Sequence, residues 1–151
     1  MERRSFVRQA GLAGVLAAGA APAVVQAQTN IRWRLASSFP KSLDTIYGGA
    51  EVFSKKASDR TGGKFQISVH AAGELMPALQ VDNGVQNGTV EMAHTVPYYF
   101  FGKDPTFALG AAIPFGMNSR PMAAWMYVGN GMKLMRELYH QYKLINPPGG
   151  K

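Results

Sequence analysis

The sequence predicts an α/β fold: a parallel sheet with crossover helices. Three segments alternate apolar and polar residues, as strands with one buried face do, at 31–35, 64–70 and 89–96. Helical patterns occupy both intervals between them, over 42–61 and 78–88. Strands that alternate with helices of this length favour parallel pairing through helical crossovers.

The first 27 residues have the pattern of an export signal rather than of a folded element. The segment "MERRSFVRQAGLAGVLAAGAAPAVVQA" has a charged start, an apolar middle rich in Gly and Ala, and a small-residue exit. Arg3 and Arg4 add a twin-arginine signature. A membrane span needs about 20 consecutive apolar residues, and Pro22 interrupts this run. We therefore expect a signal over 1–27 that is cleaved after Ala27, and no lipid-modified N-terminus because no cysteine follows.

Composition excludes several classes of function. The chain has 16 Lys and Arg against 9 Asp and Glu, but the cations form no basic run, so no nucleic-acid partner is expected. The absence of cysteine excludes disulfides and thiolate metal sites.

The first crossover helix has a clear expected face. Ser42 is the expected N-cap, and Gly62 and Gly63 supply the stop. The residues expected to be buried recur at helical spacing: Ile46, Ala50, Phe53 and Ala57.

The tail predicts two helices within 118–143, separated at 129–131. Asn118 or Ser119 is the expected cap, with Pro121 in the first turn. The apolar run 106–115 fits a buried strand or a crossing segment. Residues 143–151 suggest a strand entering a Pro-Gly turn, and we interpret the chain as an incomplete domain over 28–151.

Two loops are expected to meet at one edge of the sheet. An exposed loop with Ser38 and Phe39 leaves the first strand, and Thr95, Tyr98 and Tyr99 follow the third. Ligands collect outside the carboxyl ends of parallel strands, and tyrosine offers an apolar wall with an O–H donor. In extended geometry the rings of 98–101 would alternate between two faces. The alternative is that all four rings cover the core.

Catalysis has little support. The three histidines fall on separate elements, His94 being interpreted as a strand residue with its bonds satisfied, and no metal site or nucleophile motif is expected. We expect no cofactor and no enzyme activity. The alternative is an exported enzyme of unknown reaction, because redox enzymes often use the twin-arginine route.

The segments "WRLASSFPKSLDTIYGGAEVFSKKASDRTGGKFQI", "AGELMPALQ" and "NGTVEMAHTVPYYFFGKDPTFALGAAIPFGM" resemble the N-terminal part of TRAP-transporter substrate-binding proteins, especially the group for 2-oxo acids such as pyruvate. The resemblance covers essentially all of 28–151. It implies a two-lobed periplasmic receptor that closes on a small organic acid by hinge motion and delivers it to a membrane permease.

The resemblance also assigns site residues. It carries ligand contact onto Phe39, Tyr98 and Tyr99, and less strongly onto Ser38 and Thr95. Family members are more than twice this length, and the arginine that pairs with their ligand's carboxylate would lie beyond Lys151. The chain alone is therefore expected to bind 2-oxo acids very weakly or not at all.

Overall fold

The sheet is parallel, as the sequence predicts. The structure, a computed structural model, describes residues 30–111 and 113–148; the expected signal over 1–27 lies outside them. The strand order is β2-β1-β3, and the strands are β1 (Ile31–Ser37), β2 (Phe65–His70) and β3 (Met92–His94). Leu35 of β1 lies opposite Val69 of β2 on one side and Met92 of β3 on the other.

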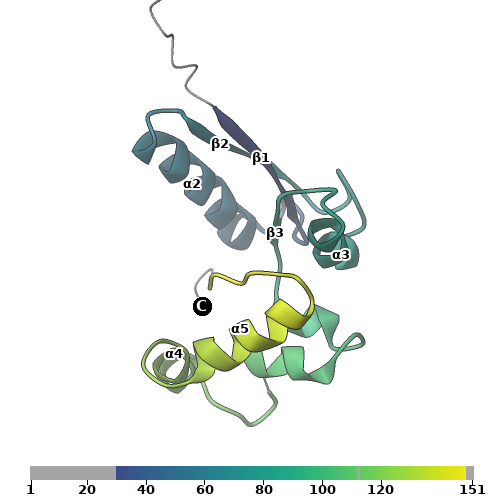
Figure 1. Cartoon of the computed structure of the whole chain (residues 1–151), viewed down its shortest axis with the longest axis vertical. Helices are drawn as coiled ribbons and strands as arrows, with labels where there is room; N and C mark the ends of the chain where they lie inside the picture. The colour runs from purple at the N-terminus through teal and green to yellow at the C-terminus, as the bar shows by residue number, and fades with distance from the viewer. Residues whose placement is uncertain (1–29, 112, 149–151) are drawn as a thin grey trace, which may run out of the picture.

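The crossover helix α2 (Asp44–Arg60) covers one face of the sheet (Figure 1). Its Ala50 packs with Leu35 and Ile67 in a small core. The expected face is partly wrong, because Ile46 and Phe53 are 45% and 47% exposed while Tyr47 is buried. The helix begins after Leu43 rather than at a Ser42 cap.

Two hydroxyl groups explain the face that α2 presents. The Tyr47 O–H donates to the Val69 carbonyl at 3.4 Å, and the Ser54 hydroxyl donates to the Ile67 carbonyl. Both acceptors belong to β2, so these bonds turn the Tyr47–Ala50–Ser54 side of the helix towards the sheet.

The larger core lies on the other side of the sheet. The second crossover contains a short 3-10 turn, η1 (Ala78–Gln80), and α3 (Val81–Gln86). This core joins the sheet and α3 to the C-terminal helices, and its buried members are Ala36, Val81, Val90, Phe100, Phe107, Met122, Met126, Met135 and Leu138.

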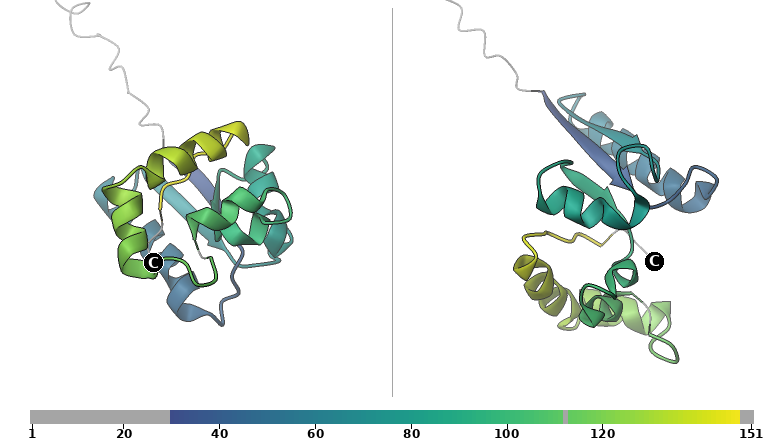
Figure 2. Two further views of the ribbon diagram at one scale, coloured as in Figure 1. Left: turned by 90° about the horizontal axis from the view of Figure 1, so that it is seen from below. Right: turned by 90° about the vertical axis from the view of Figure 1, so that its right-hand side faces the viewer.

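In the described residues after β3, the regular elements are all α-helices or 3-10 helices. They are η2 (Pro97–Phe100), η3 (Pro105–Gly110), α4 (Ser119–Tyr127) and α5 (Gly131–Gln141). These elements lie beyond the carboxyl ends of the strands (Figures 1 and 2). The two predicted tail helices are confirmed, with Asn118 as the cap that accepts from the Arg120 N–H at 3.2 Å.

The strand alternative for the run 106–115 is wrong, and so is the strand expected from residue 143 onward, over its described part. Residues 105–110 form η3, because Asp104 caps it by accepting from the Thr106 N–H at 2.8 Å and because Phe107 is buried in the core. Residues 143–148 form no strand: Lys143 has a left-handed backbone conformation (φ 57°), and the Leu144 N–H returns to the Tyr139 carbonyl. Within 30–111 and 113–148, no helix has the length and apolar character needed to cross a bilayer.

Candidate functional site

The loop after β1 and the segment after β3 meet, as predicted. The Ser38 N–H donates to the His94 carbonyl at 2.8 Å, which extends the β1–β3 pairing into the loop. The rings of Phe39 and Tyr99 then approach to 6.1 Å between centroids. Tyr98 packs edge-on against Tyr99 at 5.1 Å. All five candidate residues belong to these two segments.

The serine and threonine of this group are used internally. The Ser38 hydroxyl lies 2.6 Å from the Ala78 carbonyl and 2.7 Å from the Thr95 hydroxyl. Because a carbonyl only accepts, Ser38 donates to Ala78 and accepts from Thr95. These bonds join β1, the second crossover and β3 at one point, so Ser38 and Thr95 hold the segments together.

The expectation of an exposed loop after β1 is wrong at its centre. Phe39 is only 4% exposed and Ser38 is buried, whereas Tyr98 and Tyr99 are 43% and 37% exposed. The solvent-facing groups of the cluster are therefore the two tyrosines. Phe39 forms a wall behind Tyr99 rather than part of an open rim.

The extended geometry expected for 98–101 is also wrong. Residues 97–100 form the 3-10 helix η2, which begins at Pro97. Phe100 turns into the core at 6% exposed, while Tyr98, Tyr99 and Phe101 remain exposed. The alternative that all four rings cover the core is therefore wrong as well.

Sequence reasoning missed His94 as a neighbour of this site. It lies opposite Ser37 in the β1–β3 register. Its Nδ1 is 3.2 Å from the Ser37 Oγ, and its ring is 5.1 Å from the Phe39 ring. Burial lowers the pKa of His94 below its ordinary value because the charged imidazolium is disfavoured. A parallel alignment of the first and third predicted strands could have paired His94 with Ser37.

The cation of the loop already has a partner. Lys41 Nζ lies 2.7 Å from the Glu74 carboxylate, which also accepts the Ala71 N–H at 3.0 Å. The Lys41 hydrogen bond is the main cause that holds the Glu74 pKa below its usual value. Lys41 thus ties the loop to the chain after β2.

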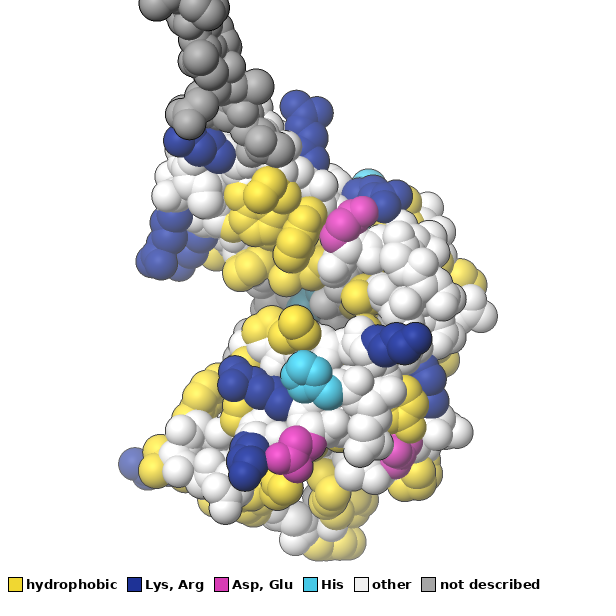
Figure 3. All heavy atoms as spheres, in the orientation of Figure 1, with side chains coloured by type: hydrophobic (Ala, Val, Ile, Leu, Met, Phe, Trp, Pro, Cys, Tyr) yellow, Lys and Arg dark blue, Asp and Glu magenta, His cyan; other side chains and the backbone are white. Residues whose placement is uncertain are grey.

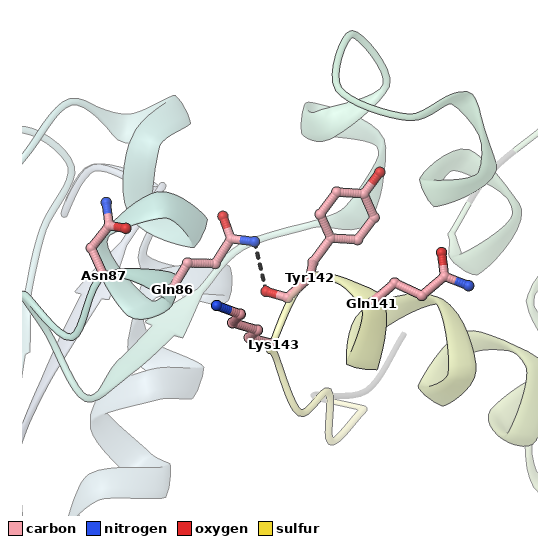
Figure 4. Close-up of a pocket in the computed structure, with 5 residues that line it drawn as sticks. All are labelled: Gln86, Asn87, Gln141, Tyr142 and Lys143. Carbon is pink, nitrogen blue, oxygen red and sulfur yellow. Dashed lines mark hydrogen bonds between the residues drawn. The ribbon is translucent and has the colours of Figure 1, made fainter.

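A separate cavity of about 270 Å³ lies between α3 and the end of α5 (Figure 4). Its lining is polar and consists of Gln86, Asn87, Gln141, Tyr142 and Lys143. The Gln86 amide crosses it and donates to the Tyr142 carbonyl at 2.6 Å. None of the five candidate residues lines this cavity.

The acidic side chains on the face drawn in Figure 3 lie apart from one another. Among the residues that the structure describes, no three or more His, Cys, Asp or Glu side chains form a group suited to a metal ion. His70 Nδ1 does approach Glu74 at 3.7 Å, but as a pair at the end of β2.

Residues 36–146 match the family described as bacterial extracellular solute-binding protein, family 7. This stretch includes both segments of the candidate site. The chain belongs to this family. Its fold is accordingly the parallel-sheet part of the family's α/β architecture.

Three relatives of this family 7 chain illustrate the likeness. The monocarboxylate 2-oxoacid-binding periplasmic protein of Nostoc sp. (strain PCC 7120) is 46% identical over 121 residues, 80% of this chain and 33% of its own length. A TRAP transporter solute-binding protein from Bordetella bronchiseptica, solved with calcium and picolinate, is 42% identical with a TM-score of 0.73. One from Pseudoalteromonas atlantica, solved with sodium and pyruvate, is 32% identical with a TM-score of 0.72.

The matches cover most of this chain but a smaller share of each relative. Each of the two solved structures is matched over 75% of this chain but over 34% of its own. The chain therefore spans about a third of the length of these relatives.

Proposed function

We propose that this chain is the first-lobe part of a TRAP-transporter solute receptor that binds a small organic acid, a 2-oxo acid such as pyruvate, and delivers it to a membrane permease. The observation that carries the proposal is the meeting of Phe39 with Tyr99 at the carboxyl ends of β1 and β3. The named ligands of the relatives, 2-oxo acids, picolinate and pyruvate, support the ligand class.

In this proposal each residue has a distinct role. Tyr98 and Tyr99 present O–H donors to a carboxylate or ketone oxygen, and Phe39 backs the Tyr99 ring. The Ser38–Thr95 hydrogen bond fixes the two segments relative to one another. Binding and release require no bond chemistry, so the protein acts as a receptor rather than an enzyme and uses no cofactor of its own.

One lobe is expected to bind poorly alone. A carboxylate is held best by a charge-assisted, often bidentate, partner in a site that excludes water, and the tyrosines are half open to solvent. A hydrogen bond to a charged group contributes about 1.5–3 kcal/mol. Two tyrosine donors in water therefore fall short of micromolar affinity, which needs about 8 kcal/mol.

A chimera tests the proposal. Residues 28–146 are joined to the remaining two thirds of the Nostoc relative, and pyruvate binding is measured by calorimetry beside the chain alone. We expect micromolar binding by the chimera only. Tyr99→Phe should weaken it roughly ten- to a hundredfold, whereas Tyr127→Phe, at an exposed position on α4, should not.

Either of two results would contradict the proposal. One is a folded chimera that binds no 2-oxo acid. The other is equal effects of Tyr99→Phe and Tyr127→Phe, which would remove Tyr99 from the site.

We further propose that residues 1–27 direct export to the periplasm by the twin-arginine route and are removed after Ala27. Replacing Arg3 and Arg4 by Lys should retain the protein in the cytoplasm, and N-terminal sequencing of the periplasmic form should begin at Gln28. Export that survives the double replacement would exclude this route.

A further inference from the structure

His94 makes two contacts at the candidate site that the proposed ligand binding does not explain. Its ring packs edge-on against Phe39, with 5.1 Å between centroids and 61° between planes. Its Nδ1 lies 3.2 Å from the Ser37 Oγ. Ser37 in turn accepts the Phe39 backbone N–H at 3.1 Å. The imidazole therefore reaches Phe39 both directly and through Ser37.

The Ser37 hydroxyl determines which nitrogen of His94 carries the proton. Ser37 is 1% exposed, so water does not reach its hydroxyl. Its oxygen accepts from Phe39, and its own proton needs an acceptor. Among the described residues, the acceptor within hydrogen-bond distance of that proton is His94 Nδ1. A proton on Nδ1 would leave the buried Ser37 O–H unpaired, which is unfavourable.

We propose that His94 is a positioning residue of the candidate site: a neutral imidazole, protonated on Nε2, whose Nδ1 orients the Ser37 hydroxyl and thereby fixes the backbone and ring of Phe39. The relay runs from Nδ1 to the Ser37 O–H and from the Ser37 oxygen to the Phe39 N–H. Only the description of Phe39 as a ligand wall rests on the proposed function.

The surroundings of the ring agree with a neutral form. Desolvation lowers the pKa of His94, and no charged side chain contributes to that shift. Among the described residues a charged ring at this position would find no carboxylate partner, which is unfavourable. The Ser37 hydroxyl, as a donor to Nδ1, requires an imidazole that is unprotonated on that nitrogen and therefore uncharged.

The first experiment reads the tautomer directly. Nitrogen-15 NMR of the imidazoles in the full chain at neutral pH distinguishes an unprotonated Nδ1 from an unprotonated Nε2. We expect His94 to carry its proton on Nε2. A proton on Nδ1 would overturn the proposal, and this result requires no variant.

Two substitutions then separate the hydrogen-bond acceptor from mere bulk. His94→Asn keeps an acceptor oxygen on Cγ, where the imidazole has Nδ1, whereas His94→Leu keeps bulk without an acceptor. Hydrogen exchange of the Phe39 amide should be about tenfold faster in the Leu variant. It should stay near the wild-type rate in the Asn variant.

Control signals distinguish this local effect from unfolding. The amide of Trp33, nearer the start of β1, should exchange at the same rate in the wild type and in both His94 variants. Nuclear Overhauser contacts between the Phe39 and Tyr99 rings should weaken in the Leu variant alone. An unchanged Phe39 rate in a folded Leu variant would overturn the relay. None of these measurements uses a ligand, so a failure to bind pyruvate would refute the proposed function without touching this inference.

Discussion

Replacing Lys103 by Met should destabilise the protein strongly, because Lys103 is the partner of a buried carboxylate. Its Nζ lies 2.7 Å from the Asp82 Oδ2, and the side chains of Asp82 and Lys103 are 7% and 30% exposed. The same Nζ donates to Asn83 at 2.9 Å and to Gln86 at 2.8 Å. The other Asp82 oxygen is buried without a hydrogen-bond partner among the described residues. The negative charge of Asp82 is therefore balanced by Lys103.

The magnitude follows from this geometry. Removing one partner of a fully buried ion pair costs about 3–5 kcal/mol. Lys103 is partly solvated, so we expect a cost below that range, about 2–3 kcal/mol. Asp82→Asn removes the charge that Lys103 neutralises, and the double variant should be more stable than the sum of the single effects by roughly 1.5 kcal/mol.

Urea unfolding of five proteins, followed by circular dichroism, measures these free energies. They are the wild type, Lys103→Met, Asp82→Asn, the double variant and a control. Lys133→Met is the matched control, because Lys133 is exposed on α5 and has no ion-pair partner recorded in the described part; its effect should stay within about 0.5 kcal/mol. Strictly additive single effects, or a Lys103→Met cost no larger than the control, would refute the reasoning.

Three further predictions concern packing, capping and protonation. Gly131→Ala should lower the free energy of unfolding by about 1–3 kcal/mol, because a Cβ there would lie 2.7 Å from the Trp125 ring. Gly48→Ala in α2 should raise it by about 0.5–1 kcal/mol, because nothing lies within 4 Å of a Cβ at that position. Thermal unfolding of both variants tests this pair of predictions. Asn118→Ala should cost about 1 kcal/mol in the same assay through loss of the α4 cap, and no cost would exclude that role. The lowered pKa of His94 means that the unfolded state binds more protons, so stability is present above pH 6.5 and falls as the pH drops below it; His94→Asn should remove this dependence from urea titrations at several pH values.

The sheet was predictable because its signals are local and periodic. Period-two alternation identified all three strands, and the alternation with helices indicated parallel pairing. Since carboxyl ends of parallel strands share an edge, the approach of Phe39 to Tyr99 followed from topology alone, and the structure confirms it.

The exact faces of the helical segments were not predictable in the same way. Ile46 and Phe53 fit a helical face as well as Tyr47 does, and the choice was made by hydroxyl bonds from α2 to the β2 carbonyls. Such bonds depend on the register of two elements and leave no pattern in either one alone.

Pro97 itself indicated the turn after β3, although the pattern of the preceding strand suggested that an extended chain continued. Proline favours the first position of a helix, and η2 begins there, with the Tyr99 N–H returning to the Val96 carbonyl. Reading 98–101 as a continuing strand ignored that preference. The consequence is functional, because the 3-10 turn sends Phe100 inward and leaves both tyrosines open.

The cations nearest in sequence to the candidate site are already paired, which supports the proposal that this chain alone binds a carboxylate weakly. The cation nearest in sequence to Phe39 is Lys41, which is paired with Glu74 at 2.7 Å. The cation nearest in sequence to Tyr99 is Lys103, which is paired with Asp82 at the same distance. Each would have to leave an acid to serve a ligand, and for Lys103 that acid is buried. In the proposed receptor neither of these cations is free to pair with the ligand's carboxylate, so we expect the favourable charge to come from another residue, while Tyr98 and Tyr99 supply hydroxyl donors. Binding by the isolated chain as tight as that by the chimera would contradict this expectation.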